Sequence, residues 1–211
     1  MTIKPSVDGL AEMPAEPPKW EPLTPQQVAE LMRGLDVPWW IAGGWALDLF
    51  AGRQTRAHAD IEVAVFRADE GKLRRHLRGW EFFVADAGTL TPLRDDQPLP
   101  DQAHQLWSRE RGHDAWQLEV LVEERDGERW FYRRHPRIGV HVRDLGRFSN
   151  EGIPYIRPDV QLLYKSKSSR GIDESDLIAL LPRLDAYQRA TLSAWISADD
   201  PAHRWLARLK F

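Results

Sequence analysis

The sequence predicts an α+β fold in which a mixed β-sheet with flanking helices is followed by a C-terminal helical region. Short apolar runs that alternate in polarity, typical of strands, occur between residues 39 and 132. Helical patterns interrupt these runs, as expected when helices flank a sheet. Beyond residue 151, helix signals follow one another. We therefore divide the chain into a leader (1–21), a sheet domain (22–150) and a helical region (151–211).

Composition indicates an ordinary globular protein, with 42% hydrophobic and 29% charged residues in 211. No apolar stretch reaches the length of about 18 residues that a transmembrane helix needs, and the N-terminus lacks a signal-peptide pattern, so a cytoplasmic location is expected. The absence of cysteine leaves carboxylates and histidines as candidate metal ligands. A formal net charge of −3 does not favour a broad nucleic-acid-binding surface.

The first elements are a leader and a helix. Residues 1–21 are rich in proline and show little periodicity, which predicts an extended or disordered segment that is dispensable for chemistry. Thr24 then caps a helix that has Pro25 at its first position and ends near Gly34.

The most informative stretch runs from Trp39 to Arg67. A short apolar strand, Trp39–Ala42, is followed by Gly43 and Gly44, which permit a tight turn and let a ligand approach the backbone. The helix predicted next, Trp45–Phe50, directs free N–H groups and the positive end of its dipole toward that turn. Such a turn suits a phosphate.

The strand predicted at Asp60–Val65 carries two carboxylates. Alternation places Asp60 and Glu62 on one face and apolar residues on the other. Same-face neighbours on a strand lie roughly 6.6 Å apart at Cα. The two carboxylates can therefore converge on one divalent ion or on two ions about 3.5–4 Å apart, an arrangement that phosphoryl chemistry uses.

These motifs together resemble the nucleotidyltransferase superfamily, and within it the aminoglycoside and lincosamide nucleotidyltransferases. The resemblance covers residues 37–124 and rests on Gly43–Asp48, Gly52–Arg56, His58 and Asp60–Glu62, which occur in order at family-like spacing. It implies a nucleotidyltransferase-type mixed sheet and an adenylyltransferase-like enzyme whose Mg²⁺ is held by Asp60 and Glu62. Glu62 stands where the antibiotic-modifying members usually have aspartate, and glutamate can also ligate magnesium.

Three basic or titratable residues between the glycine pair and the acids are candidate nucleotide-binding residues. Arg53 and Arg56 either neutralise triphosphate charge or form structural salt bridges. His58 is predicted to orient the site or contact phosphate rather than to ligate the metal, because carboxylates suit magnesium better than imidazole does.

The elements that follow complete the predicted sheet. Residues 69–78 form an amphipathic helix whose outward face carries four basic residues and is predicted to be solvated rather than to bind nucleic acid: Lys72, Arg74, Arg75 and Arg78. Strands at residues 80–84 and 104–109 flank a loop, residues 91–102, that is long enough to help shape a substrate mouth.

A clearer strand, Trp116–Glu124, carries the third acid of interest. Alternation places Glu119 on the face opposite Leu118 and Val120. By pattern alone, Glu119 is equally well an exposed strand glutamate. In the resembling family a carboxylate on this strand is the general base or a metal ligand beside the paired acids, which implies Glu119 in that role, with Glu123 and Glu124 as alternatives.

Helices are predicted for the remainder of the chain. One begins at Pro158, and the resemblance implies that its Lys165, or else Lys167, reaches the nucleotide phosphates; the alternative is a surface lysine. Asp173 is predicted to cap the next helix, and two closing helices are predicted at residues 184–196 and 201–209.

The resemblance implies a Mg²⁺-dependent nucleotidyltransferase that moves a nucleoside monophosphate, AMP from ATP, onto a hydroxyl of a small polar acceptor, with an aminoglycoside or lincosamide antibiotic as the first candidate. In this interpretation Gly43 and Gly44 bind the phosphates and Glu119 takes the hydroxyl proton. No membrane or nucleic-acid partner is expected. Two alternatives stay open: a nucleotidyltransferase of toxin–antitoxin type that modifies a protein, and a catalytically silent member of the fold that binds a nucleotide or a partner.

Overall fold

The computed structural model describes residues 11–12, 19–168 and 170–210. Twelve strands occur within them: β1 (Ala11–Glu12), β2 (Trp39–Ile41), β3 (Glu62–Phe66), β4 (Trp80–Asp86), β5 (Thr89–Leu93), β6 (Gln105–Glu110), β7 (Leu118–Glu123), β8 (Arg125–Asp126), β9 (Arg129–Phe131), β10 (Gly139–His141), β11 (Gly146–Phe148) and β12 (Pro154–Ile156). Nine of them form one mixed sheet in the order β1-β5-β4-β6-β7-β3-β2-β12-β11, and β10-β9-β8 form a small second sheet.

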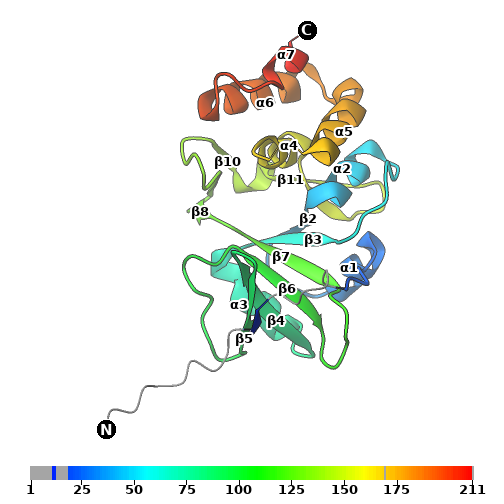
Figure 1. Ribbon diagram of the computed structural model, residues 1–211, viewed down its shortest axis with the longest axis vertical. Coiled ribbons are helices and arrows are strands. Elements are labelled where there is room, and N and C mark those ends of the chain that lie inside the picture. The colour runs from blue at the N-terminus through cyan, green and yellow to red at the C-terminus, as the bar shows by residue number, and fades with distance from the viewer. Residues whose placement is uncertain (1–10, 13–18, 169, 211) are drawn as a thin grey trace.

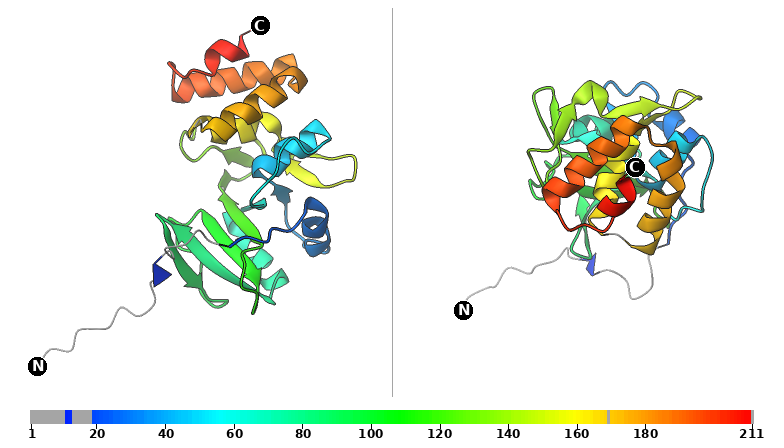
Figure 2. Two further views of the ribbon diagram at one scale, coloured as in Figure 1. Left: turned by 45° about the vertical axis from the view of Figure 1, so that its right-hand side comes forward. Right: turned by 90° about the horizontal axis from the view of Figure 1, so that it is seen from above.

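The described helices are α1 (Pro25–Leu31), α2 (Gly43–Ala51), α3 (Arg67–His76), α4 (Pro158–Ser166), α5 (Gly171–Leu180), α6 (Ala186–Asp199) and α7 (Leu206–Leu209), with two 3₁₀ turns, η1 (Val142–Asp144) and η2 (Leu181–Arg183). Helices α4–α7 gather with α2 at one end of the molecule, and β4, β5 and β6 lie toward the other end (Figure 1). Helix α6 lies over α4, and α7 lies at the end of that stack (Figure 2). The predicted α+β class, a mixed sheet with flanking helices and a C-terminal helical region, is confirmed.

Strand β3 lies at the centre of the sheet, antiparallel to β2 and parallel to β7. Its residues Val63 and Val65, with Ile61 just before the strand, pack in one hydrophobic core with side chains of α1 and α3. Ala64 and Phe66 point to the opposite face and pack in a second core with α2 and α4–α7. Because both faces of β3 are covered, only its first residue, Glu62, presents a charge to the space between sheet and helices.

Several boundaries differ from the sequence-based expectations. The strand expected to start at Asp60 starts at Glu62, so Asp60 lies in the loop just before β3. The loop expected at residues 91–102 begins inside β5, which pairs with β4. The helical region expected from residue 151 begins with a strand, β12. This strand joins the main sheet parallel to β2, and its Tyr155 pairs with Ile41.

Two polar side chains also depart from expectation. Arg74, expected on a solvated face, is buried; it forms an ion pair with Glu70 and donates hydrogen bonds to the carbonyls of Arg94 and Gln97. Asp173, expected as a helix cap, lies three residues after the actual cap, Arg170. Its carboxylate accepts a hydrogen bond from the Arg170 backbone N–H instead.

The leader predicted at residues 1–21 lies largely outside the described residues. Its last part is ordered, because Trp20 forms a bridge with Trp116 and its ring packs edge-on against Trp107 at 5.2 Å. Over the described ranges, the structure contains no helix with the length and apolarity needed to cross a membrane.

Candidate active site

The glycine pair forms the first turn of α2 directly after β2. Gly43 has a φ of +63°, a left-handed conformation that glycine adopts without the strain a side chain would bring. A Cβ at Gly43 would lie 1.7 Å from Oε2 of Glu62, and a Cβ at Gly44 would lie 2.4 Å from the Arg56 guanidinium and 2.5 Å from Nδ1 of His58. Glycine at both positions therefore lets these site side chains lie against the backbone, and a Cβ at either position would displace them.

The carboxylates of Glu62 and Glu119 come from neighbouring parallel strands. The two residues are direct partners in the register of β3 and β7, on the same face of the sheet. Gln105, on β6, donates a hydrogen bond of 2.7 Å to Oε1 of Glu119. Asp60, in the loop before β3, is half-buried and close enough for its charge to act on both glutamates. The structure thus brings together the three acids that the sequence singled out.

Burial and the repulsion of neighbouring charges make Glu62 and Glu119 costly to ionise. Burial, followed by the charge of Asp60, raises the pKa of Glu62 from 4.5 to about 7. Burial, followed by the charges of Glu62 and Asp60, raises the pKa of Glu119 well above its usual value. Strongly perturbed carboxylates in a cavity are typical of functional sites.

An unsatisfied carboxylate oxygen of Glu62 indicates that this group of acids can bind a divalent cation. Among the described residues, Oε2 of Glu62 is buried and has no hydrogen-bond partner, which is costly unless a ligand satisfies it. In that same part of the chain, no group of three or more His, Cys, Asp or Glu residues is arranged to hold a metal ion by itself. Magnesium is usually bound by one or two carboxylates together with substrate phosphates, so an incomplete protein site is the form expected for it.

His58 is held by a carboxylate within α2 that the sequence-based reasoning did not single out. Nε2 of His58 lies 2.6 Å from Oδ2 of Asp48, and the Thr55 hydroxyl donates to Oδ1 of Asp48 at 2.5 Å. The imidazole also stacks on the Trp45 ring, with 4.4 Å between ring centroids. Burial alone would raise the pKa of Asp48, but the hydrogen bonds from His58 and Thr55 lower it overall. Asp48 therefore fixes both the loop that leads to Asp60 and the orientation of His58.

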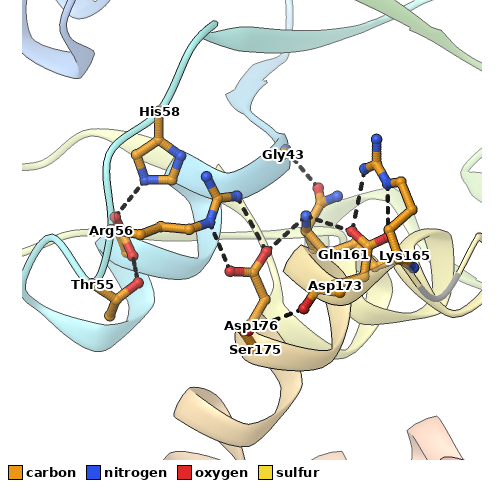
Figure 3. Close-up of polar contacts among 12 residues, drawn as sticks. Gly43, Thr55, Arg56, His58, Gln161, Lys165, Asp173, Ser175 and Asp176 are labelled. Atoms are coloured by element: carbon orange, nitrogen blue, oxygen red, sulfur yellow. Dashed lines mark hydrogen bonds and ion pairs between the residues drawn. The ribbon is translucent and has the colours of Figure 1, made fainter.

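Arg56 and Lys165 share a carboxylate partner on α5 (Figure 3). The Arg56 guanidinium bonds both oxygens of Asp176, at 2.9 and 3.2 Å. The Lys165 ammonium lies 2.8 Å from Asp176 and 3.2 Å from Asp173, and its side chain is only 9% exposed. For Arg56 the structure shows the salt bridge of the two alternatives. Lys165 is not a surface lysine, because its side chain is nearly buried and lines the cavity beside Glu62. Lys167 is exposed at the end of α4.

A cavity of about 240 Å³ lies between the sheet and α4. It is lined by residues of four regions: Gly43 and Glu62 at one side, Gln105 and Glu123 from β6 and β7, Arg133 and Arg134 after β9, and Gln161, Tyr164, Lys165 and Arg170 from the helical region. Gln161 also accepts a hydrogen bond of 2.8 Å from the Gly43 N–H (Figure 3). The cavity therefore combines carboxylates with a larger number of cations, a composition suited to a nucleoside triphosphate and its metal.

Arg53 is the predicted residue that lies apart from this group. It is exposed and lines a separate cavity of about 700 Å³ between α1, α2 and the β11–β12 loop. Asp48, Gln161 and Asp176 belong to the site but were missed. Asp48 had a usable signal, because it lies four residues after Gly44 and thus on the same face of α2. Gln161 and Asp176 had none, since their contacts join segments more than a hundred residues apart.

The fold is similar to that of known nucleotidyltransferases. The family model described as aminoglycoside-2''-adenylyltransferase matches residues 26–88, the segment that contains the glycine pair, His58, Asp60 and Glu62. No curated protein matches the chain.

Solved structures extend the likeness over most of the chain. A crystal structure of ANT(2'')-Ia in complex with adenylyl-2''-tobramycin is similar over 82% of this chain and 95% of its own, with a TM-score of 0.53 and 15% sequence identity. A solution structure of ANT(2'')-Ia is similar over 82% of this chain and 89% of its own, with a TM-score of 0.54 and 16% identity. The lincomycin-bound lincosamide antibiotic adenylyltransferase LnuA is similar over 74% of this chain and 92% of its own, with a TM-score of 0.51 and 20% identity. The predicted resemblance to aminoglycoside and lincosamide nucleotidyltransferases is confirmed, and at these identities the structural likeness establishes the fold.

Proposed function

We propose that the protein is a Mg²⁺-dependent nucleotidyltransferase that transfers AMP from ATP to a hydroxyl of a small polar acceptor, of the aminoglycoside or lincosamide kind. The observation that carries the proposal is the Glu62–Glu119 pair. Two carboxylates with raised pKa values lie side by side on neighbouring parallel strands. Glu119 is buried, and the half-buried Glu62 lies against the glycine turn with one buried oxygen that no described residue satisfies. Desolvating these two carboxylates costs free energy that a purely structural role would not offset, whereas a ligand-binding or catalytic role explains it.

In the proposed reaction Asp60 and Glu62 hold the metal, and Glu119 is the general base. As the acceptor oxygen bonds to the α-phosphorus of ATP, its proton passes to Glu119, the bond from that phosphorus to the bridging oxygen breaks, and pyrophosphate leaves. The raised pKa of Glu119 suits this role, because a carboxylate with a raised pKa is a stronger base than an ordinary glutamate and takes a proton more readily. Gln105 orients the Glu119 carboxylate through the hydrogen bond to Oε1.

Bound Mg²⁺ would reduce the repulsion among the acids and neutralise charge on the triphosphate. The first turn of α2 offers backbone N–H groups to the phosphates, and Arg56, His58 and Lys165 surround it with positive or polar groups. The ion pairs that Arg56 and Lys165 make with Asp176 hold these cations in place before a nucleotide arrives.

The test is release of pyrophosphate from ATP in the presence of Mg²⁺ and either tobramycin or lincomycin, with mass spectrometry of the acceptor to detect a gain of AMP. We expect an adenylylated acceptor with one of the two, and no product without Mg²⁺. Unmodified acceptors, with ATP neither bound nor consumed, would refute the proposal. ATP binding without turnover would instead favour the catalytically silent alternative.

A further inference from the structure

Glu123 lies at the other end of β7 from Glu119 and lines the cavity that Glu62 also lines, and neither the proposed metal site nor the proposed base accounts for it. It is on β7, on the face that carries Glu119 and Leu121, and it is 7% exposed. Its Oε2 accepts two hydrogen bonds, of 2.7 Å from the Trp130 indole N–H and of 2.6 Å from the Tyr164 hydroxyl. Both donors are neutral.

The second oxygen of Glu123 is free to take a ligand. Among the described residues, no group donates a hydrogen bond to Oε1, and Oε1 is not one of the fully buried polar atoms that lack a partner. It is therefore open to the cavity that Glu123 lines. In the described part of the chain neither nearby arginine bonds this oxygen. Arg134 lies over the rings of Tyr132 and Tyr164, 5.8 Å from each centroid, and donates to the Tyr132 hydroxyl. Arg133 also lines the cavity, and its charge acts on Glu123 without a hydrogen bond or ion pair between the two.

Position excludes Glu123 as a substitute for Glu119. Four residues of strand separate the two, roughly 13 Å at Cα, and the register pairs Glu123 with Phe66, at the end of β3 far from Glu62. A ligand that reacts beside Glu119 and also reaches Glu123 must extend along the strand. Burial raises the pKa of Glu123, since its two hydrogen bonds and the charge of Arg133 only partly offset its desolvation.

We propose that Oε1 of Glu123 binds an amino group of the substrate and so selects amine-bearing ligands. This proposal depends on the proposed function in one respect: that function identifies ATP and the acceptor as the two ligands. An amino group is the donor that the chemistry favours, because a cationic or polarised N–H compensates a buried carboxylate better than a hydroxyl does. The group can come from an amine of the acceptor or from the exocyclic amine of the adenine base, and the experiment separates these sources.

The experiment measures equilibrium binding by calorimetry, so it does not depend on turnover. The ligands form two matched pairs: tobramycin with its fully N-acetylated derivative, and ATP with the analogue in which hydrogen replaces the exocyclic amine. The variant is Glu123→Gln. The matched control is Glu124→Gln, because Glu124 is the next residue, pairs with Arg67 at 2.7 Å and does not line the cavity.

We expect wild-type protein to bind tobramycin at least tenfold more tightly than the acetylated derivative, and Glu123→Gln to lose most of that preference while Glu124→Gln keeps it. Ten- to hundredfold is the usual worth of a hydrogen bond to a charged group. If the preference lost is the one between ATP and its analogue, the amine belongs to the nucleotide. The proposal is overturned if the wild-type protein discriminates within neither pair, a result that does not require the variant to fold, or if a folded Glu123→Gln variant keeps both preferences. Intact preferences without any AMP transfer would instead refute the proposed function alone.

Discussion

Replacing Glu62 with glutamine should stabilise the ligand-free protein and abolish its activity. The reason is the raised pKa of Glu62, about 7 in the folded protein against 4.5 for an ordinary glutamate. Below pH 4.5 the side chain is protonated whether or not the chain is folded, so it costs nothing. As the pH rises from there through 7, the unfolded chain gives up its proton first, and the folded state loses stability until both are ionised.

The difference between about 7 and 4.5, at about 1.36 kcal/mol per pH unit, gives a loss of up to about 3 kcal/mol at pH 8. The neutral amide of Glu62→Gln removes this loss. We therefore expect the variant to be more stable than wild type by up to about 3 kcal/mol at pH 8, about 6–12 °C in Tm for a chain of this length, and by less than about 1 kcal/mol at pH 5.

Urea unfolding at pH 5 and pH 8 without divalent cations measures this difference. Glu30→Gln is the control because Glu30 is exposed and, among the described residues, its ion pair is with the exposed Arg33. Mg²⁺ with ATP should stabilise wild type more than the variant. A Glu62→Gln variant no more stable than wild type at pH 8, or stabilised equally at both pH values, would refute the argument that burial and repulsion destabilise this carboxylate.

Three further predictions concern the proposed reaction. Asp60→Asn should abolish AMP transfer while leaving Tm within about 2 °C of wild type, because Asp60 is half-buried in a loop; near-normal pyrophosphate release would rule out its role in metal binding. Gly44→Val should weaken ATP binding measured by calorimetry, since its Cβ would displace Arg56 and His58; unchanged affinity in a folded variant would count against the glycine turn as a phosphate site. Glu119→Gln should lower kcat by about 10²–10⁴-fold with a much smaller change in ATP affinity, and an equal loss of ATP affinity would make Glu119 a metal ligand instead.

The parts of the site that the sequence predicts are those whose residues have a recognisable spacing within a short segment. The glycine pair is recognisable because it interrupts an apolar strand and a helix, and the acids Asp60, Glu62 and Glu119 are recognisable because they break apolar strands at regular positions. The same patterns locate the central strands of the sheet, and this is why the fold class could be predicted correctly.

What the sequence does not predict depends on contacts between distant segments. Whether Lys165 faces solvent or lines the cavity is decided by Asp173 and Asp176 on the following helix, and no periodicity within α4 contains that information. The burial of Arg74 likewise depends on a later loop, because its guanidinium donates hydrogen bonds to carbonyl groups of that loop. The pattern of basic residues on the helix does not contain this information.

The order in which the site residues occur along the chain has a consequence for biosynthesis. The glycine turn and the acids emerge from the ribosome first, whereas the residues that fasten and complete the turn, Gln161 on α4 and Asp176 on α5, emerge near the end. At about 5–20 residues per second, translation of the segment from Glu119 to Asp176 takes roughly 3–11 s. During that interval the nascent chain carries a group of like charges without its helical cover. A polypeptide released prematurely in this segment would contain every proposed metal ligand and the proposed base, yet it would lack the surface against which a nucleotide could be held.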